Sequence, residues 1–168
     1  MGVLNVTPDS FSDGGDHATV DTAIAYGGQL VADGADVVDV GGESTRPGAQ
    51  RVPEQVELTR VVPVVEALAQ QGVRCSVDTT RAGVAAAAVE AGAVLVNDVS
   101  GGLADPRMLA AVADLGVPFV AMHWRGHSDS MQSQAVYDDV VKEVCDQLAE
   151  RLEACEKAGI AEVLVDPG

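Results

Sequence analysis

The architecture of the chain follows from a pattern seen most clearly in Val37-Val38-Asp39-Val40-Gly41-Gly42-Glu43-Ser44-Thr45-Arg46-Pro47-Gly48. A β-branched run interrupted by one carboxylate predicts a strand, and the glycines and polar residues after it predict a loop. Paired glycines let a backbone approach a ligand closely, and Arg46 offers a planar fork that suits phosphate. A strand that opens into a chemically capable loop is thus the unit to be expected elsewhere along the chain.

Strands and helices alternate along the whole sequence. Each predicted helix stops at a glycine followed by a small apolar residue, as expected for a left-handed C-cap before a strand; these glycines are Gly34, Gly72, Gly92, Gly116 and Gly159. The strands are predicted at residues 2–6, 36–41, 73–78, 93–98, 117–123 and 162–166. Asp105-Pro106 predicts a further helix start, with an N-cap and Pro at the first helical position. Strict alternation implies parallel βα units in one domain, residues 1–168.

Polar residues at the strand ends favour one α/β architecture. Nearly every predicted strand finishes in a residue capable of binding or chemistry: Asn5, Asp39, Asp78, Asn97, His123 and Asp166. Single groups contributed by separate strands to the same end are typical of a TIM (β/α)8 barrel. A doubly wound sheet would gather its site at one switch point, usually behind a glycine-rich fingerprint that this sequence lacks. About six strands and five helices are too few to close such a barrel, so we expect a barrel truncated at its C-terminus.

A second polar loop follows the first predicted strand, in Asn5-Val6-Thr7-Pro8-Asp9-Ser10-Phe11-Ser12-Asp13-Gly14-Gly15. It combines an amide, carboxylates and hydroxyls with a single aromatic residue. This mixture suits a mobile loop that closes over an anionic, partly aromatic ligand. The alternative is an ordinary turn built from Pro, Asp and Gly.

Composition narrows the classes of partner. Hydrophobic residues make up 47% of the chain and aromatic residues only 3%, which favours an Ala/Val/Leu core of helices packed on parallel strands. A net charge of −16 argues against a nucleic-acid partner. The three cysteines form no paired motif and fit a reducing cytosol, so we expect a cytoplasmic protein. No apolar run approaches the roughly 20 residues of a membrane-spanning helix, so no membrane partner is expected.

The sequence resembles the dihydropteroate synthases of folate biosynthesis. The matching motifs follow that family's order along the whole chain: Asn5 to Gly15, Gly41 to Gly48, Ser76-Val77-Asp78-Thr79, Val96-Asn97-Asp98-Val99-Ser100-Gly101-Gly102, Met122-His123-Trp124 and Asp166-Pro167-Gly168. The resemblance implies a transferase that condenses hydroxymethyl-dihydropterin pyrophosphate with p-aminobenzoate, giving dihydropteroate and pyrophosphate. It also implies a Mg²⁺ cofactor, sensitivity to sulfonamides and a homodimer when full length.

The pterin-binding residues follow from this resemblance and from hydrogen-bond chemistry. Carboxylates accept from the amino and ring N–H groups of a pterin, whereas an amide both donates and accepts. By resemblance, Asp78, Asn97 and Asp166 hold the pterin and Met122 packs against its ring. Asp39 is expected to lie deeper and to support this network.

The remaining expected site residues belong to the two polar loops. By resemblance, Asn5 is the Mg²⁺ ligand, and Asp13 joins it when the first loop closes. Thr45 and Arg46 shield the reacting centre and help to shape the aminobenzoate site. Phe11 and Pro47 are the expected apolar walls of that site and bind substrate. The expected catalytic residues are Asn5, Asp13, Thr45 and Arg46.

Two other readings remain open. A corrinoid-dependent methyltransferase has a pterin-binding barrel with similar strand ends, but it would not need the two loops at Asn5 to Gly15 and Gly41 to Gly48. The second reading is a non-catalytic, truncated pterin-binding fragment. The resembling family takes further substrate contacts from a Lys, a Ser-Arg pair and an Arg-x-His segment on its last two strands. This sequence lacks those two strands, so we expect the fragment alone to be inactive.

Overall fold

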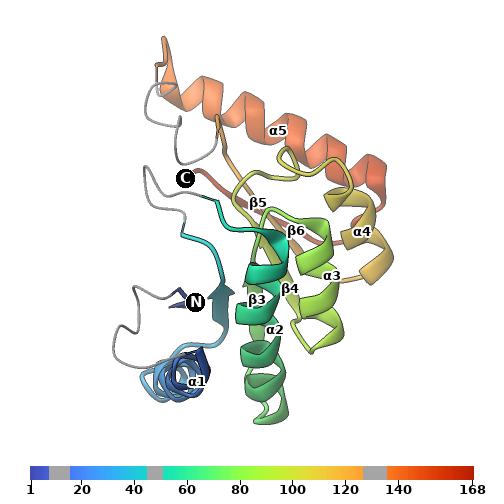
Figure 1. The fold of residues 1–168 in the computed structure, drawn as a ribbon. Coiled ribbons are helices and arrows are strands. Elements are labelled where there is room, and N and C mark those ends of the chain that lie inside the picture. Colours follow the sequence, from blue (N-terminus) through green and yellow to red (C-terminus); the bar gives the residue numbers. More distant parts are fainter. Residues whose placement is uncertain (8–15, 45–50, 127–135) are drawn as a thin grey trace.

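A computed structural model describes residues 1–7, 16–44, 51–126 and 136–168 of the chain. Strands and helices alternate without exception in this part (Figure 1). In chain order the elements are β1 (Gly2–Asn5), α1 (Asp16–Ala32), β2 (Val38–Gly41), α2 (Glu54–Gln70), β3 (Cys75–Asp78), α3 (Ala82–Glu90), β4 (Leu95–Asp98), α4 (Met108–Leu115), β5 (Phe119–Met122), α5 (Val140–Ala158) and β6 (Val163–Asp166).

The strands form one six-stranded parallel sheet in the order β1-β2-β3-β4-β5-β6. Each helix contacts the next one, and the five helices follow one another in an arc along the sheet (Figure 1). Sequential strand order with no switch point excludes a doubly wound sheet. The predicted fold is therefore confirmed, as six strands and five helices of a (β/α)8 barrel.

Side chains alternate between the two faces of every strand, as the pleat requires. One face carries small and medium apolar residues that are fully buried in the core, namely Leu4, Val38, Val40, Cys75, Val77, Val96, Phe119 and Ala121. They share this core with helix residues that include Val61, Val64, Val65 and Leu68 of α2 and Val84, Ala85 and Ala88 of α3. The opposite face, which corresponds to the barrel interior, carries the polar residues at the strand ends.

The predicted helix ends are confirmed by backbone geometry. All five predicted glycines have a positive φ, for example 67° at Gly116 and 90° at Gly159, which cap α4 and α5 in the left-handed region. The prediction for Asp105 was wrong, because α4 begins at Met108. The Asp105 carboxylate accepts from the backbone N of Arg107, just before α4, at 3.0 Å, and from the backbone N of Ala82, the first residue of α3, at 3.0 Å, so it contacts the starts of two helices.

Apolar side chains remain exposed at both edges of the sheet and on α5. On the barrel-interior face, Val3 of β1 is 58% exposed and Leu164 of β6 is 46% exposed. Apolar side chains of α5 are also uncovered, since Val141 and Leu152 are exposed and Cys155 is the one buried residue of that helix among those described. In a closed barrel, these surfaces would be covered by further βα units.

Candidate ligand site at the carboxyl ends of the strands

Parallel pairing brings the polar strand ends into one row. Asn5 pairs with Gly41, Gly41 with Asp78, and Asp78 with Asn97. These four residues therefore lie side by side at the carboxyl end of the sheet, on the same face. This is the end at which (β/α)8 barrels bind their ligands.

Asp39 lies one layer deeper and organises its neighbours. Its side chain is buried and accepts from the Ser76 hydroxyl at 2.5 Å and from Nδ2 of Asn97 at 2.9 Å. Burial raises the pKa of Asp39, and the hydrogen bonds from Ser76 and Asn97 oppose that rise. The bond to Asp39 also fixes the orientation of the Asn97 amide. Asp39 thus lies beneath Asn97, and its supporting role in ligand binding stays a prediction.

The carboxyl group of Asp78 has a strongly raised pKa. Burial, followed by the negative charges of Asp39, Glu57, Asp98 and Glu43, raises its pKa to about 8. No hydrogen bond from the described residues is made to this carboxylate to oppose the rise. The site is thus short of hydrogen-bond donors, and a ligand that presents N–H groups would stabilise the carboxylate.

The missing side chain at Gly41 leaves room between Asp78 and Asn5. A Cβ atom built on Gly41 would lie 3.2 Å from Oδ2 of Asp78 and 3.5 Å from Oδ1 of Asn5. Both oxygens therefore border the same space beside the backbone of β2. A side chain at this position would crowd the carboxylate of Asp78.

Met122 and Asp166 form the other end of the row. They are register partners at the ends of β5 and β6. Met122 is partly buried, and Asp166 is exposed, with Oδ1 accepting from the backbone N of Gly168 at 2.9 Å. Next to them, Nε2 of His123 lies 3.0 Å from Oε1 of Gln147. A flexible thioether beside an exposed carboxylate suits the ring face and polar edge of a planar ligand.

Five of the predicted site residues lie outside the residues that the structure describes: Phe11, Asp13, Thr45, Arg46 and Pro47. Of the six described ones, Asn5, Asp39, Asp78 and Asn97 come together on adjoining strands, and Met122 and Asp166 continue the same sheet end. Their individual roles in binding stay predictions.

The described residues suit a hard cation only as a partial ligand set. Among them there is no cluster of three or more His, Cys, Asp or Glu side chains that could enclose a metal. Asn5 nevertheless offers an exposed amide oxygen beside Asp78. Mg²⁺ commonly takes one or two protein oxygens and completes its shell with water and phosphate oxygens, so Asn5 fits such a partial site.

Sequence reasoning missed Ser76 and a buried ion-pair network behind the site. Glu57 of α2 is only 1% exposed and contacts Thr79 and Arg81. Helical spacing contained the signal, because Glu57 lies on the same face as Val61, Val64 and Leu68. A carboxylate on a buried helix face requires a partner, and that requirement points to a nearby arginine.

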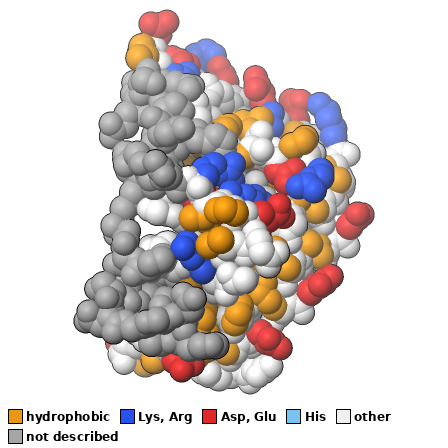
Figure 2. Space-filling view, viewed as in Figure 1, with side chains coloured by type: hydrophobic (Ala, Val, Ile, Leu, Met, Phe, Trp, Pro, Cys, Tyr) orange, Lys and Arg blue, Asp and Glu red, His pale blue; other side chains and the backbone are white. Residues whose placement is uncertain are grey.

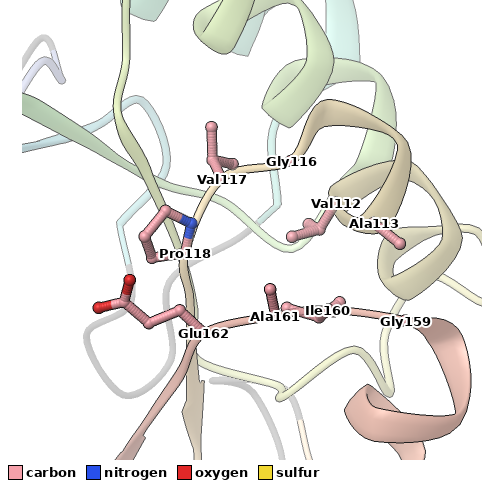
Figure 3. A pocket seen from close by; sticks show the side chains of 9 residues that line it. All are labelled: Val112, Ala113, Gly116, Val117, Pro118, Gly159, Ile160, Ala161 and Glu162. Atoms are coloured by element: carbon pink, nitrogen blue, oxygen red, sulfur yellow. The ribbon is translucent and has the colours of Figure 1, made fainter.

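A small pocket lies at the opposite end of the strands (Figure 3). It has a volume of about 140 Å³ and is lined by Val112, Ala113, Gly116, Val117, Pro118, Gly159, Ile160, Ala161 and Glu162. Pro118 precedes β5 and Glu162 precedes β6, so the pocket is at the amino ends of these strands. Barrel enzymes use this end for stability rather than chemistry. We therefore do not place the functional site there.

Fold and site together define the class of the protein: it has six strands and five helices of a (β/α)8 barrel, with polar side chains gathered at the carboxyl ends of the strands. The comparison with known families agrees with this class. The model of the family described as pterin binding enzyme matches residues 1–168, and the chain belongs to that family.

Individual relatives are dihydropteroate synthases. The chain is 53% identical to the dihydropteroate synthase of Mycobacterium leprae, over all of this chain and 60% of that protein. A solved Xanthomonas albilineans dihydropteroate synthase with 4-aminobenzoic acid is 53% identical with a TM-score of 0.91, covering 100% of this chain and 60% of the other. A second structure from that organism, in complex with 7,8-dihydropteroate, is 48% identical with a TM-score of 0.85, covering 100% and 59%. The chain thus spans about three fifths of the length of these relatives.

Two further findings concern membrane spans and cysteines. None of the helices in the described part of the chain has the length and apolar character needed to cross a bilayer. Cys75, Cys145 and Cys155 are all free thiols.

Proposed function

We propose that this chain, within a complete barrel, carries the reaction of dihydropteroate synthase. Hydroxymethyl-dihydropterin pyrophosphate and p-aminobenzoate would be condensed to dihydropteroate and pyrophosphate. The proposal is supported by the names of its relatives and by the ligands in two of their structures, 4-aminobenzoic acid and 7,8-dihydropteroate.

One observation carries the proposal for the pterin. Asp78 and Asn97 end adjacent strands, and Asp39 orients Asn97 from below. The donor-poor surroundings of Asp78 match the amino and ring N–H groups of a pterin, which would each donate to a carboxylate. Asp166 would accept from the same polar edge, and Met122 would pack against the ring.

The chemistry requires departure of pyrophosphate and exclusion of water. The C–N bond forms at the pterin methylene as its C–O bond to pyrophosphate breaks, and the nitrogen then loses a proton to solvent. No protein nucleophile is needed, so the chain's residues act by orienting the pterin and by shielding the reacting carbon. We assign the shielding to Asp13, Thr45 and Arg46, and the aminobenzoate walls to Phe11 and Pro47, on the family resemblance.

Magnesium belongs to this proposal as well. Asn5 would hold Mg²⁺ together with pyrophosphate oxygens and water. A bound Mg²⁺ would stabilise the negative charge of the leaving group. The role of Asn5 itself is to offer one neutral oxygen beside the pterin site, so its replacement by Leu should weaken the magnesium dependence of turnover more than pterin binding.

A second candidate function is a pterin-binding fragment without catalysis. The exposed apolar side chains of Val3 and Leu164, on the interior face of the two edge strands, favour it for the 168 residues alone. We therefore propose that turnover requires further barrel strands.

In the complete protein we also propose a cytoplasmic homodimer, which sedimentation at several concentrations would test.

The test is pyrophosphate release measured with and without p-aminobenzoate. A chimera in which residues 1–168 replace the matching part of the Mycobacterium leprae relative supplies a complete barrel. The proposal predicts release that requires p-aminobenzoate and yields dihydropteroate in equal amount. Release that is independent of p-aminobenzoate, or methyl transfer from a methylated pterin, would count against it.

A further inference from the structure

A buried carboxylate lies directly behind the candidate pterin site. Glu57, in the first turn of α2, is 1% exposed and accepts from the Thr79 hydroxyl at 2.6 Å. Its second oxygen contacts Nη1 of Arg81. A buried charge persists only when it is paired in this way, so Arg81 is required beside Glu57.

Arg81 also contacts both ends of the connection between β2 and α2. Its Nη1 lies 2.9 Å from Oε2 of Glu43, at the start of that connection, and its Nη2 donates to the carbonyl of Val52 at 2.6 Å, near its end. Arg51 adds a second link, with Nε 3.2 Å from Oε1 of Glu43 and Nη2 2.9 Å from the Thr80 hydroxyl. Two arginines thus join this connection to the residues that follow β3.

The same residues are tied to the site. Thr79 follows Asp78 directly, and its backbone N donates to the carbonyl of Asn97 at 3.1 Å. The Thr79 hydroxyl accepts from the backbone N of Arg81 at 3.2 Å. A continuous path of hydrogen bonds therefore runs from the pterin strand ends through Arg81 to Glu43 and Val52.

The charges of Arg81 and Arg51 are matched by carboxylates. The Arg81 side chain is 14% exposed and lies between Glu57 and Glu43, whose side chains are 1% and 15% exposed. On the face shown in Figure 2, basic side chains gather near the middle of the molecule with acidic side chains beside them. A guanidinium that is already shared by two carboxylates and a carbonyl holds these groups in place, and it has little capacity left to bind a further anion.

We infer that Arg81 is a positioning residue, which fixes the ends of the β2–α2 connection against the strand end that carries Asp78. This inference rests on the proposed function. It assigns to Arg81 an effect on transfer to p-aminobenzoate, exerted through Glu43 and Val52, and no direct contact with the pterin.

The experiment compares Arg81→Lys with Arg74→Lys in the chimera. Lysine keeps a positive charge beside Glu57 but lacks the planar fork that reaches Glu43 and Val52 together. Arg74 is an exposed arginine just before β3, at the opposite end of the same strand, and is the matched control. Glu43→Gln is a second variant that leaves the contact between Arg81 and Glu57 in place.

The readouts separate positioning from stability. Arg81→Lys is expected to lower kcat at least about tenfold, with the Kd of pterin pyrophosphate changed by less than about twofold. Adding Glu43→Gln to Arg81→Lys should cost little more, because both act through one contact. Calorimetry and hydrogen exchange on the 168-residue chain carrying Arg81→Lys complete the test. Faster exchange of the backbone amides is expected at Glu43, Ser44 and Arg51.

Each other outcome overturns the inference. Kinetics of Arg81→Lys equal to those of Arg74→Lys would show that Arg81 does not position the site. A parallel loss of pterin affinity and of stability would make the network merely structural. Should Arg81→Lys not fold, an unchanged kcat in Glu43→Gln decides against the inference. An unmutated chimera without turnover would contradict the proposed function and this inference with it.

Discussion

At Asp78, burial and the neighbouring negative charges both raise the pKa of the carboxyl group. The carboxyl group is held among Asp39, Glu57, Asp98 and Glu43, and its pKa rises from 3.8 to about 8. We therefore expect Asp78 to be protonated near neutral pH when no ligand donates to it. A pterin that donates N–H groups to this carboxyl would favour its charged form, so binding near neutral pH should release a proton.

The raised pKa of Asp78 also predicts how stability depends on pH. As pH rises from about 4 to about 8, the unfolded chain loses this proton first, so the folded state binds more protons and the free energy of unfolding falls. Asp78→Asn removes the effect. The variant should gain stability over the unmutated chain as pH increases across this range, whereas Asp114→Asn, at an exposed position on α4, should not. Urea unfolding at both ends of the range measures this, and an equal difference at the two ends would refute the charge environment described.

Among elements, the junction of β2 with α2 has little room for added atoms. A Cβ atom on Gly42 would lie 2.8 Å from Cγ2 of Val61 and 3.2 Å from the backbone oxygen of Glu57. Because the backbone of α2 cannot move aside cheaply, this contact sets how closely the strand end approaches the helix.

Gly42→Ala is therefore expected to destabilise the protein by about 1–3 kcal/mol. Gly28→Ala is the matched control, since Gly28 lies within α1 and a Cβ atom added there would have no neighbour within 4 Å. That control should stabilise by about 0.5–1 kcal/mol, because alanine loses less entropy in a helix. Denaturant unfolding of both variants tests the packing, and a neutral Gly42→Ala would show that the junction is looser than described.

The elements also show what the sequence could and could not predict. Glycine caps predicted the C-terminal ends of the five helices within two residues, and the observed strands start at most two residues after their predicted starts, because those signals are local. The start of α4 was predicted two residues too early, at Pro106. The contact of Asp105 with Ala82 was missed because Ala82 belongs to another helix and is brought near only by the fold. Val141 and Leu152 of α5 are exposed, because their burial depends on neighbours that the described chain does not provide.

For the candidate site, too, the sequence predicted some residues and missed others. Strand-end position was enough to bring Asn5, Asp39, Asp78 and Asn97 together, because parallel strands align their carboxyl ends. The Arg81 network was missed, since it depends on contacts between residues 43, 57 and 81 that no short motif records.

For the molecule as a whole, the two edge strands determine whether chains associate with one another. β1 and β6 each pair on one side only, and Val3, Leu164 and Val165 are exposed there. Unpaired edges with apolar side chains promote association with other chains. We predict that the 168-residue chain self-associates and has turnover far below that of the chimera.

Light scattering and the pyrophosphate assay, run on both proteins at equal concentration, test this prediction. Val3→Lys combined with Leu164→Lys should reduce association of the chain, because charges on an edge oppose pairing. A monomeric chain with turnover close to that of the chimera would show that the open edges are harmless.

Calorimetric titration of the chimera with pterin pyrophosphate tests the central claim most directly, because it measures binding at the strand ends without requiring turnover. Replacing Asp78 by Ala should weaken binding by about 1–3 kcal/mol for each ligand N–H left unpaired. Asp114→Ala, on the outer helix α4, should bind as the unmutated protein does. Unchanged affinity in Asp78→Ala would contradict the claim that the pterin is held at the carboxyl ends of β3 and β4.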